Sequence, residues 1–78
     1  MRKVKLIWDF RGPNAERTAQ HHELHLKEYL KIENILFEET GQQNINEFHS
    51  IAFVIVYENA MQKLRDDLKP HRGQVHGS

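Results

Sequence analysis

The sequence predicts an α+β fold in which an open antiparallel sheet carries two helices on one face. Three observations predict it: apolar and polar residues alternate near the N-terminus, a helical repeat follows Pro13, and a continuous apolar run spans residues 51–57. That run is short and rich in β-branched and aromatic residues, which is typical of a strand buried on both faces. Helices cover one of these faces, so we expect something else, most simply a second copy of the chain, to cover the other.

The first strand and the first helix are predicted for the N-terminal half. Apolar side chains occupy every second position over residues 4–10, which is the period of a strand. Pro13 and Asn14 suit a helix start, with Asn14 as the cap or Pro13 in the first turn. A helix over residues 15–33 then places one apolar face toward the sheet. The residues of that face are Ala15, Ala19, His22, Leu26, Tyr29 and Leu30.

A hairpin and a second helix are predicted for the C-terminal half. Residues 35–39 form the second strand. Residues 40–44 are rich in turn formers and form the hairpin loop, which can extend to Asn46, and residues 48–57 form the third strand. Helical spacing of apolar residues follows, and Pro70 ends it. Residues 1–70 are therefore expected to form one domain, with residues 71–78 as a flexible tail.

The resulting order is β-α-β-β-α, with the third strand lying between the other two and antiparallel to both, in the strand order 1-3-2. The first strand is then an exposed edge, unless Gln74-Val75-His76 supplies a short fourth strand. We expect the chain to dimerise through the free sheet face or through this edge. In register, the helix-covered face holds Ala52, Val54 and Val56 of the third strand. The open face carries Lys5, Ile7, Asp9, His49, Ile51, Phe53, Ile55 and Tyr57.

This arrangement resembles the ferredoxin-like fold, and in particular the small dimeric α+β-barrel proteins that include the YCII-related group. The resemblance covers strand order and an apolar inner face over most of the chain, and the fourth strand of that fold is missing here. It implies sheet-to-sheet packing between two subunits. It implies no catalytic residue, because no motif of this chain identifies one subfamily.

Composition excludes several classes of protein. The 78 residues contain no cysteine, which excludes disulfides and thiolate metal sites. Eleven basic and eleven acidic residues leave a formal charge of zero, which argues against nucleic-acid binding and against binding to an anionic membrane. The run His49–Val56 matches the Ala-Phe-Val centre of an RNA-recognition motif, but Ile51 and Ile7 occupy positions that stack bases. Without a signal peptide or a membrane span, a soluble cytoplasmic protein is expected.

A candidate ligand or catalytic site lies at one end of the open face. Asp9 and His49 are expected at the same edge of adjacent antiparallel strands, where a carboxylate beside an imidazole can orient it for proton transfer. Arg11, Glu39 and His71 are expected near the same end, where they could hold an anionic ligand. Phe53 would contact that ligand. The alternative interpretation is a polar rim that closes a dimer interface.

A candidate metal site lies on the first helix. His21 and His25 are four residues apart, so both rings can reach one ion. The third ligand would be His71, His76, Glu28 or a group of a partner subunit. The alternative is that these are ordinary boundary histidines of an amphipathic helix.

Three functions are therefore compatible with the sequence. The first is a non-catalytic homodimeric domain that binds a small ligand or another protein through the sheet face, without a cofactor. The second is a dimeric-barrel enzyme that uses Asp9 and His49 for proton transfer. The third is a metal binder that uses histidine ligands.

Overall fold

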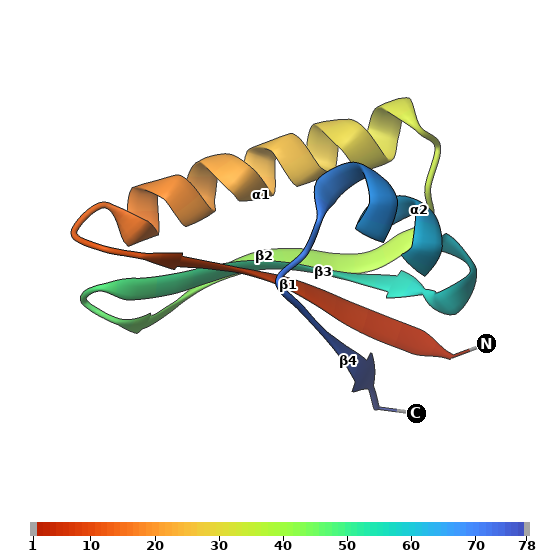
Figure 1. Cartoon of the computed structure of the whole chain (residues 1–78). Coiled ribbons are helices and arrows are strands. Elements are labelled where there is room, and N and C mark those ends of the chain that lie inside the picture. The colour runs from red at the N-terminus through yellow and green to blue at the C-terminus, as the bar shows by residue number, and fades with distance from the viewer. Residues whose placement is uncertain (1, 78) are drawn as a thin grey trace.

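The computed structural model describes residues 2–77, which form a sheet of four strands and two helices (Figure 1). Along the chain the elements are β1 (Lys3–Arg11), α1 (Ala15–Ile32), β2 (Phe37–Asn46), β3 (His49–Tyr57), α2 (Glu58–Leu68) and β4 (Arg72–His76). Gly12, at a φ of 113° that glycine adopts without strain, turns the chain from β1 toward α1. None of the helices within residues 2–77 is long and apolar enough to span a membrane.

The sheet is antiparallel throughout, in the order β2-β3-β1-β4. The predictions that β3 lies between β1 and β2, and that both helices lie on one face of the sheet, are confirmed (Figure 1). In the β1–β3 register Leu6 lies opposite Val54 and Ile7 lies opposite Phe53. Because successive strand residues point to opposite faces, the first pair faces the helices and the second pair faces away from them.

The helix-covered face holds the main hydrophobic core. Its buried residues are Val4, Leu6, Trp8, Ala19, Leu26, Leu30, Ala52, Val54, Val56 and Leu64. Trp8 also donates a hydrogen bond from its indole Nε1 to the carbonyl oxygen of Leu68, at 2.8 Å. This bond ties the last turn of α2 to the sheet and gives the buried indole N–H the partner that it requires.

The prediction that the sheet lacks a fourth strand is wrong. Residues 72–76, expected to belong to a flexible tail, form β4 and pair with β1 from Ile7–Arg72 to Lys3–His76. β4 therefore occupies the edge of β1 that the sequence left open, and dimerisation through that stretch of edge is excluded. The pattern was missed because β4 is short and polar, so that backbone pairing rather than side-chain burial stabilises it.

The predicted hairpin loop at residues 40–44 is also wrong, because this segment is the middle of β2. The turn lies further on, between Asn46 and His49. β2 is an edge strand whose side chains are largely exposed, so turn-forming and amide residues are tolerated there. Gly41 has a specific role, since a Cβ at this position would lie 2.4 Å from Cζ of the Phe53 ring. The absence of a side chain at Gly41 lets that ring lie across β2.

The open face carries a second cluster, called here the apolar strip, which consists of Ile7, Ile51, Phe53 and Ile55. We expected this surface to be uncovered in a single chain, and that expectation is wrong: the four residues are 2%, 4%, 9% and 3% exposed. The Phe53 ring spreads over Gly41, and the Lys5 ammonium lies 4.3 Å from the centre of that ring. The long polar side chains around the strip therefore shield it within one chain.

Curvature of the sheet contributes to this shielding. Glu38 of β2 contacts Lys3 of β1 and lies 3.7 Å from Nε2 of His76 on β4. Strands lie about 4.8 Å apart, so β2 and β4 would be roughly 14 Å apart in a flat sheet. A contact between side chains of the two edge strands therefore indicates that the sheet curls toward its open face at this end.

Candidate functional site

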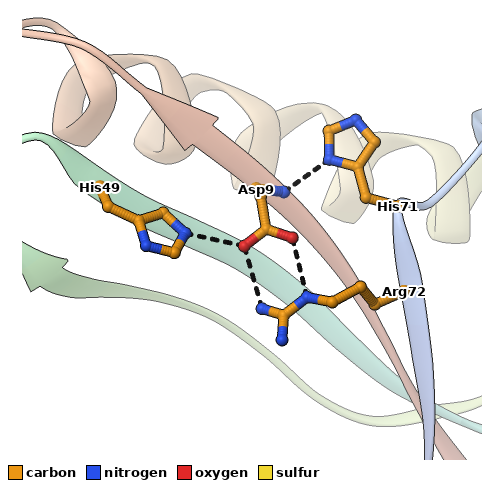
Figure 2. A network of polar contacts seen from close by, with 4 residues as sticks. All are labelled: Asp9, His49, His71 and Arg72. Atoms are coloured by element: carbon orange, nitrogen blue, oxygen red, sulfur yellow. Dashed lines mark hydrogen bonds and ion pairs between the residues drawn. The ribbon is translucent and has the colours of Figure 1, made fainter.

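A network of polar side chains, called here the polar cluster, lies at the other end of the sheet and consists of Asp9, His49, His71 and Arg72 (Figure 2). Arg72 binds the Asp9 carboxylate through two hydrogen bonds, Nε to Oδ2 at 2.8 Å and Nη2 to Oδ1 at 2.9 Å. His49 Nε2 lies 2.8 Å from the same Oδ1. On the other side, the Asp9 backbone N–H donates to His71 Nδ1 at 2.8 Å.

The sheet register brings these residues together. His49 pairs with Arg11, so it is the diagonal neighbour of Asp9 on the same face. Arg72 pairs with Ile7 from the other side of β1 and is likewise diagonal to Asp9. Three strands therefore fix the carboxylate and its two side-chain partners on a rigid scaffold.

The electrostatics of the polar cluster keep Asp9 ionised. Partial burial by itself raises the pKa of this carboxyl, but hydrogen bonds and charge from Arg72 and His49 outweigh that effect, so the pKa of Asp9 lies below its ordinary value. Since His49 presents Nε2 to the carboxylate, that nitrogen donates and Nδ1 is the ring position left to accept a proton. The side chains of His49 and Asp9 are 14% and 15% exposed, so a solute can still reach them.

The predicted proximity of Asp9, His49 and His71 is confirmed. His71 directly precedes β4. Its backbone N–H donates to the Ile7 carbonyl, and its ring packs edge-on against Phe10. Its Nδ1 accepts the Asp9 N–H and therefore carries a lone pair rather than a proton. His71 thus positions β4, and with it Arg72.

The other predicted ligand-binding residues are placed differently. Arg11 is directly opposite His49 and exposed, as expected for a residue near the polar cluster. Glu39 is not near it: this residue pairs with Ile55, toward the opposite end of β3. The placement was wrong because β2 runs beyond the expected loop, which carries its first residues away from Asp9. Phe53 lies in the apolar strip, shielded by its neighbours.

Arg72 is the residue of the polar cluster that sequence reasoning missed. A signal was present, because a short strand was considered at residues 74–76. Extending that strand by two residues toward the N-terminus includes Arg72 and brings it beside β1. Alternation along β4 then places Arg72, Gln74 and His76 on the open face.

The histidines of α1 find no third metal ligand within the described part of the chain. His21 and His25 are exposed on the helix, and within residues 2–77 no three potential metal ligands gather around one point. His22 lies on the predicted apolar face of α1, and its buried Nε2 has no hydrogen-bond partner among residues 2–77. Its ring instead packs between Trp8 and Phe10. Burial, and then the charges of His25 and His71, lower the pKa of His22.

Comparison of the chain with protein-family models, with curated proteins and with solved structures finds no match. The geometry of the chain's own residues therefore carries the functional argument.

Proposed function

We propose that this chain is a small binding domain whose site is the polar cluster together with the adjoining end of the apolar strip. The bidentate pair between Asp9 and Arg72 carries this proposal. It holds a guanidinium on an open, rigid sheet face, with His49 fixed beside it at hydrogen-bond distance from the same carboxylate.

The charge around the site favours an anionic ligand. Asp9 is the acidic member of the polar cluster, and both of its oxygens are already engaged by Arg72 and His49. Arg11, directly beside His49, takes part in none of the ion pairs formed among residues 2–77. A carboxylate or phosphate group bound by Arg11 and the outer edge of Arg72, beside the His49 ring, would satisfy the free guanidinium donors.

A titration followed by NMR tests this proposal. Inorganic phosphate and acetate are added separately to ¹⁵N-labelled protein, and both arms should shift the amide signals of residues near Asp9 and His49. Arg11→Gln should weaken the binding several-fold. The matched control is Arg17→Gln, because Arg17 is exposed on α1, on the helix-covered side of the sheet. Equal binding by both variants, or no shift near Asp9, would reject the site.

We also propose that the chain is homodimeric and ferredoxin-like. The order β2-β3-β1-β4 and the two helices on one face support the resemblance, and β4 supplies the strand that was thought missing. Because the apolar strip is buried within one chain, it no longer supports dimerisation, and the support for a dimer is this resemblance. Sedimentation velocity over a range of concentrations tests it, and a single species with the mass of one chain would contradict it.

The second candidate function is proton transfer by His49. The distance of 2.8 Å between Nε2 and Asp9 Oδ1 favours it, since an ionised aspartate fixes the ring tautomer and leaves Nδ1 as a base. The pairing of Asp9 with Arg72 opposes it, because the carboxylate that would orient His49 is shared with the Arg72 guanidinium. If substrate screening finds an activity, His49→Ala should lower it by a factor of about 100 or more. An unchanged rate would leave binding as the function of the site.

A further inference from the structure

We infer that a groove between α2 and β4 binds a small amphipathic carboxylate, with an alkyl or aryl body and one acidic head group. The groove lies on the helix-covered side of the sheet. Two of its lining residues, His71 and Arg72, also belong to the polar cluster. The inference does not rest on the function proposed above, because the ligand would be held by Arg65 and the apolar floor of the groove. Its volume is about 360 Å³. It is lined by Val4, Leu6, Met61, Arg65, Pro70, His71, Arg72, Gly73, Gln74 and Val75.

The groove exists because no helix covers β4. The α1 helix packs on β1, β2 and β3, the α2 helix packs on β1 and β3, and β4 projects beyond them from the edge of the sheet (Figure 1). Gly73 lies opposite Leu6 on the helix-covered face and contributes no side chain to fill the space. Val75, the next residue of β4 on this face, is 67% exposed. An apolar side chain held this far out of the core is available to a ligand.

The floor of the groove is apolar and rigid. Val4 and Leu6 are almost fully buried residues of the central strand β1, and Met61 and Pro70 form the wall nearest α2. The volume falls at the lower end of the range of about 300–1,000 Å³ that is usual for small-molecule sites. A short alkyl chain or a single aromatic ring is therefore the body that this floor can accept.

The rim of the groove supplies positive charge. Arg65 of α2 lines it and forms no ion pair with any carboxylate of residues 2–77, whereas Lys63 on the same helix is paired with Glu33 and Asp67. No aspartate or glutamate is among the lining residues. A guanidinium without a partner, beside an apolar floor, matches a ligand that carries a carboxylate at one end, because arginine binds carboxylates through two parallel hydrogen bonds.

The test compares hexanoate with 1-hexanol by NMR titration of the whole chain. Hexanoate should shift the amide signals of Leu6, Gly73 and Val75, and hexanol should do so more weakly. Gly73→Val should reduce hexanoate binding at least tenfold by filling the groove. This substitution suits the strand, because φ at Gly73 lies outside the left-handed region and an added Cβ meets Leu6 at an ordinary contact distance of 3.5 Å. Gly77→Val is the matched control, because a Cβ there meets nothing within 4 Å.

A second variant separates charge from shape. Arg65→Gln should weaken hexanoate binding to the level of hexanol and leave hexanol binding unchanged. Shifts confined to residues around Asp9 and His49, or no shift at Gly73, would overturn the groove assignment. So would full hexanoate binding by Gly73→Val with an unchanged melting temperature. Equal loss of both ligands in Arg65→Gln would overturn the assignment of a carboxylate ligand.

Discussion

Replacement of Gly41 by alanine should destabilise the fold, although the same exchange in an ordinary strand is neutral or favourable. The new Cβ would lie 2.4 Å from Cζ and 2.7 Å from Cε1 of the Phe53 ring. Non-bonded carbon atoms prefer a separation of about 3.5–4.0 Å, so the ring must retreat by about 1 Å or more. Its retreat is opposed from above by Lys5, whose ammonium lies over the ring.

The expected magnitude follows from two opposing contributions. Overpacking of a buried side chain costs about 1–3 kcal/mol. The loss of backbone freedom in the unfolded chain on going from glycine to alanine returns about 0.4–1 kcal/mol. The net effect of Gly41→Ala on the free energy of unfolding is therefore a loss of about 1–2 kcal/mol, or roughly 5–15 °C in Tm for a domain of this size.

Urea denaturation of four proteins measures this effect: the wild type, Gly41→Ala, Phe53→Leu and the double variant. The smaller leucine leaves room for the new Cβ, so Gly41→Ala should cost less in the Phe53→Leu background, with a coupling energy of about 1 kcal/mol. Gly77→Ala is the control and should change stability by less than about 0.5 kcal/mol. A Gly41→Ala protein as stable as the wild type would refute the packing of Phe53 over β2, and with it the shielding of the apolar strip.

Three further substitutions test two pKa shifts and one buried hydrogen bond. The lowered folded-state pKa of His22 means that the unfolded chain takes up the proton first, so the wild type should lose stability as pH falls below about 6.5. His22→Phe should remove this loss and stabilise the protein by about 1 kcal/mol, because the unpartnered Nε2 is gone. If the free energy of unfolding, measured in urea, depended on pH equally in the wild type and in His22→Phe, the assignment would be contradicted. The pKa of Asp9 is also lowered, which for a carboxylate gives stability that is present above about pH 4 and lost as pH falls through the folded-state value. Asp9→Asn should therefore lower the free energy of unfolding by about 1–3 kcal/mol at pH 7 and by progressively less toward pH 3. A difference between variant and wild type that stays constant with pH would argue against the pairing of Asp9 with Arg72. Trp8→Phe should cost about 1–3 kcal/mol, since it leaves the Leu68 carbonyl without its indole donor, and should speed amide exchange in the last turn of α2; unchanged exchange there would show that the bond does not hold α2.

Elements with a strong side-chain pattern could be predicted from the residues alone. The alternation over residues 4–10, the helical repeat after Asn14 and the apolar run at residues 51–57 predicted β1, α1 and β3 closely. The pairing of β1 with β3 and the packing of both helices on one face could then be predicted. Buried side chains reveal the period of each element and the face that it turns toward the core. The meeting of Asp9 with His49 was predictable for the same reason, since register alone makes them neighbours.

Features that depend on backbone pairing and on contacts between distant segments became visible only in the folded chain. The long polar strand β2 and the short strand β4 bury few side chains, so composition resembled a loop in one case and a tail in the other. Their pairing with β3 and β1 brings Arg72 to Asp9 and carries Glu39 away from it. The shielding of the apolar strip likewise arises from the curl of the sheet and from the space above Gly41. Both depend on how the strands pair, so the pattern of residues along the chain does not reveal them.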